Sequence, residues 1–238
     1  MPAANTFNEV VGLDLKVLGN GKYILWIVDM FSKVLKGHYI ESKTPETIVN
    51  AIIKSWIIGD GFGPGHPSRG FYSDNGGEFL NQEVIDFAAA VDTNIKMTAG
   101  NAPWQNGIVE RNHATADIIY EKLMLENPDM KPQEAINHAA LAKNSEVNRS
   151  GFSSLQLVMG QNPAFPGLAE VTPASSNLND SSKAMKALKN IDDARVKFRQ
   201  FDCNEKLKKA RSLKINPAVE RHYDMGDPVF ICDDKRKQ

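Results

Sequence analysis

The first forty residues contain three strand patterns and no helix pattern, and this order limits the possible folds more than any other feature. Apolar side chains alternate over residues 9–18, as in a half-buried strand, and Leu18 to Lys22 has the glycines and asparagine of a hairpin turn. Tyr23–Asp29 is an almost continuous apolar run, typical of a strand buried on both faces. A third pattern covers residues 34–40, so we expect three antiparallel strands at the start of the fold.

Helix and strand patterns alternate after these strands. Thr44, Pro45 and Glu46 give a helix cap, a first-turn proline and a first-turn acid, and the apolar stripe predicts a helix that ends near Ile58. Short strands are predicted over residues 71–73 and 94–98, and helices over residues 81–91, 107–126 and 131–147. The result is an α/β fold with a five-stranded mixed sheet flanked by helices.

Composition excludes two classes of protein. Hydrophobic residues make up 42% of the chain and charged residues 24%, as in ordinary globular proteins and unlike disordered chains. The longest apolar run is too short to span a bilayer, and the N-terminus has no secretory signal pattern. The five histidines are scattered and the two cysteines, Cys203 and Cys232, are not paired in a motif, so no zinc site is predicted and a reducing compartment is expected.

Three acids lie at positions where a carboxylate needs an explanation. Asp14 is in the middle of the first strand, where a buried carboxylate is costly unless it lies at an edge-strand surface or binds a metal. Asp74 ends a short aromatic strand before Asn-Gly-Gly, which is also ordinary turn chemistry. The first strand should be central and the fourth should pair beside it, which would bring Asp14 and Asp74 together. Glu110 can reach them if its helix packs alongside the sheet.

Carboxylates that converge in this way repel one another unless cations neutralise them. Oxygen ligands favour Mg²⁺ or Mn²⁺. Two such ions about 3.5–4 Å apart would stabilise both oxygens of a phosphodiester displacement. The sequence therefore predicts a two-metal site at Asp14, Asp74 and Glu110.

The motifs around these acids resemble the catalytic core of retroviral and retrotransposon integrases. They read Gly-Leu-Asp-Leu at Asp14, Ser-Asp-Asn-Gly-Gly-Glu-Phe at Asp74, and Gln-Asn-Gly-Ile-Val-Glu-Arg-Asn at Glu110, with the family's gap of 35 residues between the last two acids. The resemblance covers residues 8–167 and implies an RNase H-like fold and DDE-type polynucleotidyl transfer, in which element DNA ends are trimmed and joined to target DNA. It also implies that Asp14 bridges two Mg²⁺ or Mn²⁺ ions, that the chain acts as a homo-oligomer on DNA, and that an active eukaryotic element works in the nucleus.

The resemblance also suggests DNA contacts. A polar loop predicted over residues 99–107 would lie near the reacting DNA ends, although a solvated loop is an equal alternative; its candidate residues are Asn101, Trp104, Gln105 and Asn106. Relatives often carry basic residues on the catalytic helix after the glutamate, where this chain has His113, Ala114 and Asp117. Arg111 and His113 could partly substitute, and an ordinary helix-surface role is equally open.

The chain divides into an acidic body and a basic tail. Residues 1–182 carry 13 Lys and Arg against 20 Asp and Glu, and residues 183–238 carry 15 against 9. Such a tail suits nucleic-acid binding or simply a solvated helix surface. We expect an integrase core over residues 1–167, a linker over 168–182 and a basic helical extension over 183–222. Residues 223–238 resemble the start of a truncated C-terminal β-barrel.

The zinc module that usually precedes the core in relatives is missing from this sequence, so we expect a fragment of a longer retrotransposon polyprotein or a truncated copy. One alternative function is a domesticated or decayed fragment that binds DNA or a partner without catalysis. A second is an RNase H-like nuclease that acts on RNA–DNA hybrids. The motifs around Asp74 and Glu110 favour an integrase over that nuclease.

Overall fold

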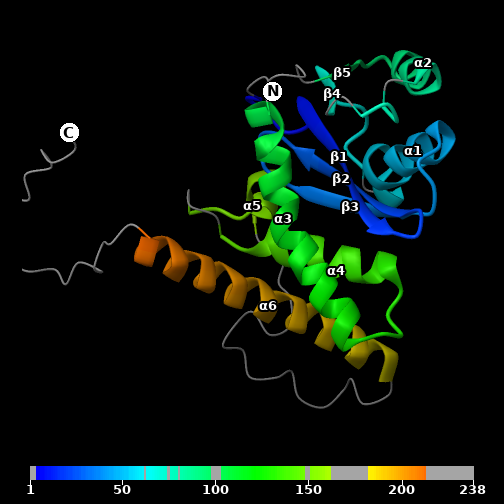
Figure 1. Ribbon diagram of the computed structural model, residues 1–238. Coiled ribbons are helices and arrows are strands. Elements are labelled where there is room, and N and C mark those ends of the chain that lie inside the picture. The colour runs from blue at the N-terminus through cyan, green and yellow to red at the C-terminus, as the bar shows by residue number, and fades with distance from the viewer. Residues whose placement is uncertain are drawn as a thin grey trace, which may run out of the picture. The chain divides into compact units, whose positions relative to one another are not determined.

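A five-stranded mixed sheet lies at the centre of the chain (Figure 1). A computed structural model describes residues 4–61, 63–73, 76–79, 81–97, 103–147, 151–161 and 182–212. The strand order is β3-β2-β1-β4-β5, with β1–β3 antiparallel and β4 and β5 parallel to β1. The strands are β1 (Val10–Gly19), β2 (Lys22–Asp29), β3 (Leu35–Ile40), β4 (Gly70–Ser73) and β5 (Ile95–Met97). The predicted mixed sheet and its central first strand are confirmed.

Two tight turns connect the antiparallel strands. Asn20 and Gly21 have φ values of 51° and 70°, the left-handed conformation that a two-residue hairpin turn requires. The turn after β2 is held by Asp29, whose buried Oδ2 accepts hydrogen bonds from the Ser32 amide (2.6 Å) and hydroxyl (2.7 Å). Both turns therefore follow from local side-chain and backbone chemistry.

Three helices begin at side-chain caps, and the predicted cap at Thr44 is among them. Thr44 accepts a hydrogen bond from the Thr47 amide, Asn81 accepts one from Glu83, and Ser153 forms a capping box with Gln156. The helices are α1 (Pro45–Ile52), continued by a π-helix η1 (Ile53–Ile57), a 3₁₀ turn η2 (Gly59–Gly61), α2 (Gln82–Ala90), α3 (Pro103–Glu126), α4 (Pro132–Ser145), α5 (Ser154–Met159) and α6 (Ser182–Ser212).

The start of α3 corrects the prediction of a loop over residues 99–107. The helix begins at Pro103 and not at Gly107, so the backbone of Trp104, Gln105 and Asn106 is helical. Proline suits the first helical position because its φ is already helical and its missing N–H would have no partner there. Residues 98–102 lie outside the described part of the chain.

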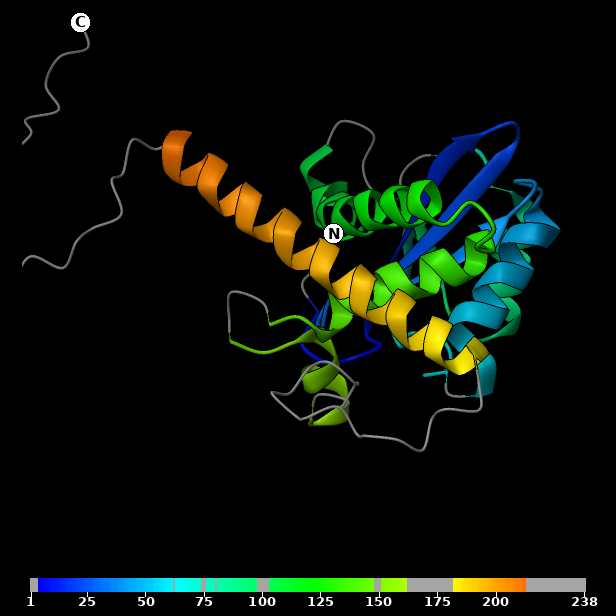
Figure 2. The same ribbon diagram turned by 90° about the horizontal axis from the view of Figure 1, so that it is seen from below.

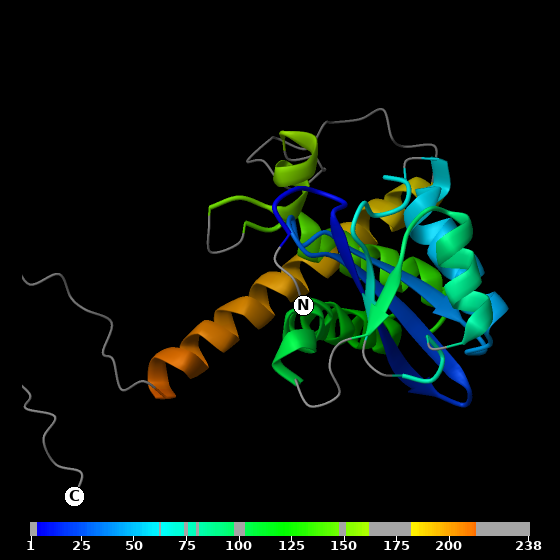
Figure 3. The ribbon, with the colours of Figure 1, turned by 90° about the horizontal axis from the view of Figure 1, so that it is seen from above.

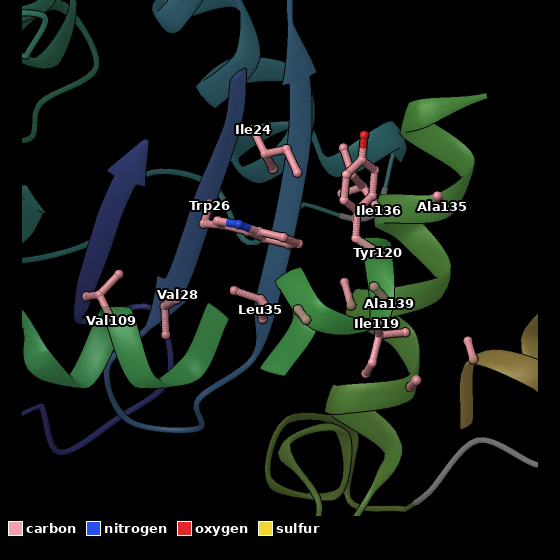
Figure 4. Close-up of a cluster of buried hydrophobic side chains, with 14 of the residues drawn as sticks. Ile24, Trp26, Val28, Leu35, Val109, Ile119, Tyr120, Ala135, Ile136 and Ala139 are labelled. Atoms are coloured by element: carbon pink, nitrogen blue, oxygen red, sulfur yellow. The ribbon is translucent and has the colours of Figure 1, made fainter. Parts of the chain in front are cut away.

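The sheet separates two apolar cores. Helices α3 and α4 pack on one face, and α1 packs against the opposite face with α2 beside it, as Figures 2 and 3 show from below and above. In the first core, side chains of β2 and β3 lie beside Ile119 and Tyr120 of α3 and Ile136 of α4 (Figure 4). Gly37 of β3 lies directly under this layer. A Cβ atom there would be 2.5 Å from both Ile136 Cγ2 and Trp26 Cζ3, so only glycine fits.

Helix α4 also covers the free edge of β3. The Asn144 side chain accepts a hydrogen bond from the Leu35 amide (2.9 Å) and donates one to the Leu35 carbonyl (2.7 Å). Near the other end of α4, the Gln133 side chain accepts a hydrogen bond from the Tyr39 amide (2.8 Å) and donates one to the Gly37 carbonyl (3.0 Å). The side-chain amides of Asn144 and Gln133 therefore bond to the backbone groups through which an edge strand would pair with another chain.

Two compact units cover residues 1–200 and 201–238. The part of α6 in the first unit is tied by Lys197 to Glu126 at the end of α3 (2.6 Å) and by Arg195 to Glu146, the residue after α4 (3.7 Å). Of the second unit, residues 201–212 are described and continue α6. The predicted linker, apart from Ser182, and the predicted barrel start lie outside the described residues, and the domain assignment remains a prediction. None of the described helices has the length and apolar character needed to cross a membrane.

Candidate active site

Asp14 lies in the middle of β1, which is the central strand of the sheet. Its side chain is 15% exposed, and the residue opposite it on β2 is Trp26. An edge-strand position therefore does not explain this carboxylate. Another cationic or polar partner must compensate its partial burial.

His113 of α3 supplies that compensation. Its Nε2 atom lies 2.6 Å from Asp14 Oδ2, and its Nδ1 atom lies 3.0 Å from Asp117 Oδ2. The first contact is an ion pair outside good hydrogen-bond geometry, and the second is a hydrogen bond between residues one helical turn apart. His113 is itself buried, so it faces the sheet and not the helix surface.

Trp26 connects Asp117 back to the sheet. The indole Nε1 donates a hydrogen bond to Asp117 Oδ1 (2.8 Å), and the indole ring stacks on the His113 ring with centroids 6.3 Å apart and planes 7° apart. Lys16 lies 3.6 Å from Asp117 Oδ2 on the more exposed side. Asp14, His113, Asp117 and Trp26 thus form a closed circuit between β1, α3 and β2, which we call the Asp14 circuit.

The electrostatics of the circuit favour a charged imidazole. Burial lowers the pKa of His113, but Asp117 and Asp14 outweigh it and raise the pKa to about 9. At neutral pH an imidazolium therefore balances the two carboxylates. The carboxylate that the sequence assigns to a metal is held here by a side chain of the same chain.

Glu110 lies one turn before His113, on the same side of α3. Its side chain is exposed. Asp74 lies outside the described residues, but its neighbours in β4 are registered with β1. Tyr72 pairs with Gly12 in a parallel ladder, so Asp74 and Asp14 each follow that pair by two residues.

The other candidate residues occupy different situations. Arg111 is exposed, and its Nε donates a hydrogen bond to the Gly107 carbonyl at 2.8 Å. Asn101 and the side chains of Trp104, Gln105 and Asn106 lie outside the described part of the chain. DNA contact by these residues remains a prediction.

The donor atoms at the site are chemically suited to a hard cation. Asp14 and Glu110 offer carboxylate oxygens, the ligands that Mg²⁺ and Mn²⁺ prefer. Within the described ranges, which exclude Asp74, three metal-binding side chains do not come together in one group. The sequence pointed to His113 and Asp117 on the catalytic helix, but it did not identify Trp26 as a partner of Asp117.

The structure is similar to solved integrase cores. The HTLV-2 integrase catalytic core domain in complex with magnesium has a TM-score of 0.53 and 24% identity, over 64% of this chain and 97% of that one. The BIV integrase catalytic core has a TM-score of 0.52 and 16% identity, over 64% and 95% of the two chains. This chain has the retroviral integrase catalytic-core fold.

A longer integrase shows the same core fold. The chain from the simian T-cell lymphotropic virus intasome gives a TM-score of 0.59 at 18% identity, over 74% of this chain and 63% of that one. No family model matches the chain, and no curated protein matches it. The similarity to integrases therefore lies in the fold and, by sequence, in the three acidic motifs.

Proposed function

We propose that this chain is an integrase catalytic domain that binds DNA and catalyses two-metal phosphodiester cleavage and strand transfer. The observation that carries the proposal is the position of Asp14. It lies mid-strand at the centre of an integrase-core sheet, in contact with the helix that carries Glu110. The register of β4 with β1 supports Asp74 as its neighbour.

Each acid has a distinct role in this proposal. Asp14 would hold both ions, and Asp74 and Glu110 would each hold one. When bound, Mg²⁺ or Mn²⁺ supplies Lewis-acid stabilisation of the attacking and leaving oxygens. Asp14 lies on the central strand and Glu110 on α3, so under this proposal the ligands would come from two regular elements of the fold.

DNA and further copies of the chain are the proposed partners. The solved relatives include a trimeric and a dimeric form of the HTLV-2 core and an intasome. Arg111 directly follows Glu110, and its side chain is an exposed cation. Such a side chain suits a phosphate contact. Residues 99–107 precede Glu110, and their polar side chains are the proposed contacts near the reacting ends.

A second candidate is binding of DNA or a partner without catalysis. One observation favours it: the Asp14 carboxylate already has a cationic partner in His113. The helix also lacks the basic residues that relatives often carry at Ala114 and Asp117. Under this alternative the chain would bind DNA equally well with or without Mg²⁺.

A disintegration assay separates the two candidates. Wild-type chain, a branched DNA substrate and Mn²⁺ should give strand-transfer products, and Asp74→Asn should reduce the rate at least a thousandfold because an anionic metal ligand is lost. Glu78→Gln is the matched control, because this acid lies in the same motif, outside the triad and 4.0 Å from Lys43. It should keep near wild-type activity.

Equal rates for wild type and Asp74→Asn, with and without Mn²⁺, would reject catalysis by this site. If both chains still bound the branched DNA with equal affinity, the non-catalytic alternative would be supported.

A further inference from the structure

His113 and Asp117 occupy helix positions for which the proposed function gives no role. Both are buried, at 8% and 6% exposure, although Arg111 and Ala114 on the same helix are exposed. A pair on a solvated helix face would not be buried in this way. Instead, His113 contacts Asp14, and Asp117 accepts a hydrogen bond from Trp26.

The circuit holds one oxygen of Asp14 and leaves the other open. His113 contacts Oδ2 at 2.6 Å, whereas Oδ1 makes no hydrogen bond to any of the described residues. Asp117 fixes the imidazole from behind through Nδ1. An aspartate side chain that is held at one oxygen has fewer rotamers to lose when the other oxygen binds a cation.

Trp26 makes the arrangement rigid. It is fully buried, it lies opposite Asp14 in the β1–β2 ladder, and it both stacks on His113 and donates to Asp117. The circuit therefore ties α3, the helix that carries Glu110, to the strand that carries Asp14. A change in any member would alter the placement of these two carboxylates relative to one another.

We propose that His113, Asp117 and Trp26 are positioning residues that orient the Asp14 carboxylate for a divalent cation and keep Glu110 in place beside it. The inference rests on the proposed function for the existence of the metal site. It assigns to His113 a role behind the metal ligand and not a contact with DNA. Partners of this kind typically change metal affinity by about 10- to 100-fold when they are removed.

Mn²⁺ binding to the full chain, measured without DNA, tests the proposal. His113→Ala and Asp117→Ala should each weaken Mn²⁺ binding about tenfold or more. Asp117→Asn should have a smaller effect, because its side-chain oxygen can still accept the Trp26 hydrogen bond. DNA affinity in the absence of metal should be unchanged in all three variants.

A second histidine–acid pair provides the control. On α4, His138 lies 3.6 Å from Glu134 with the same spacing of four residues, and the pair has no contact with Asp14. His138→Gln should leave Mn²⁺ affinity unchanged. Thermal unfolding of every variant identifies any variant that fails to fold. If an alanine variant fails to fold, Asp117→Asn still tests the inference.

The indole protons give a readout independent of activity. Mg²⁺ should shift the Trp26 indole N–H resonance, because its acceptor Asp117 belongs to the circuit. The Trp56 indole donates to Asn8 and should not respond. In Asp117→Ala the response of Trp26 should be lost.

Two results would overturn the inference while leaving the proposed function intact. Mn²⁺ affinity equal to wild type in His113→Ala and Asp117→Ala would show that the circuit does not position Asp14. Tighter binding in His113→Ala would show that His113 competes with the metal. If the wild type bound no Mn²⁺, the proposed metal site would fail, and this inference with it.

Discussion

The two faces of the sheet each bury a tryptophan, and the partners of these tryptophans differ. Trp26 on the α3–α4 face and Trp56 on the α1 face are both fully buried. Each uses its only polar atom in a hydrogen bond of similar length, 2.8 Å to Asp117 and 2.9 Å to Asn8. The acceptor is charged on the first face and neutral on the second.

The acceptor of each indole hydrogen bond determines which part of the fold the tryptophan is linked to. Asn8 donates in turn to the carbonyls of Pro64 (2.9 Å) and His66 (3.0 Å), so the Trp56 bond ties the N-terminal segment to a loop. Asp117 leads to His113 and Asp14, so the Trp26 bond ends at the candidate active site. The comparison shows that a buried donor supports structure or function according to the next group in its network.

The largest stability effect should come from Asn8→Ala on the structural face. It removes the acceptor of Trp56 and the donor to the loop, and it places alanine at a φ of 59°. We expect the free energy of unfolding to fall by about 3 kcal/mol. This is the cost of leaving the buried Trp56 N–H without an acceptor plus the cost of backbone strain.

Urea unfolding would measure the change, and Asn8→Gly would remove the steric strain, since glycine accepts that φ without a Cβ clash. Equal losses in the two variants would remove strain from the explanation. A loss below the error of the measurement in both would show that the Asn8 bonds add nothing to stability.

On the opposite face, Gly37→Ala should cost about 2 kcal/mol by overpacking. The added Cβ would be 2.5 Å from Ile136 Cγ2 and from the Trp26 ring, and both side chains are buried. Because Trp26 must move, Mn²⁺ affinity should fall together with stability, unlike in Asn8→Ala. A Gly37→Ala chain with wild-type metal affinity would show that the Trp26 ring can shift without disturbing Asp14.

The smallest effect should be a difference in pH dependence between the faces. The pKa of His113 rises from 6.5 to about 9 in the folded chain. The stability that it contributes is therefore fully present below pH 6.5 and lost as the pH rises through about 9. His113→Gln should flatten this part of the stability curve by on the order of 1 kcal/mol.

The free energy of unfolding, measured by chemical denaturation at pH 6, 8 and 10, would give the difference. These pH values lie below, within and above the range in which the His113 contribution is lost. Asn8→Ala should keep the wild-type slope, because neither Asn8 nor Trp56 titrates. A His113→Gln curve parallel to that of the wild type would mean that the imidazolium does not stabilise the fold.

Much of the fold was predictable because its signals are local. The hairpin at Asn20 and Gly21 and the Thr44 cap follow from turn and capping chemistry. The pairing of β4 beside β1 is not local, and the order of strands and helices predicted it. The start of α3 was wrong by four residues, because polar residues after Pro103 were interpreted as a loop. Helix boundaries depend on packing that the sequence pattern does not contain.

The sequence by itself determined the acids: three motifs at family spacing, with Asp14 on a central strand. Only the tertiary structure decided what compensates Asp14. Counting back from the pair Gly19–Lys22 would place Asp14 opposite Ile27, but an irregularity between Val17 and Gly19 shifts the ladder and places it opposite Trp26. A shift of one residue exchanges the two faces of a strand, so the partners of Asp14 depended on a local backbone adjustment and on the docking of α3.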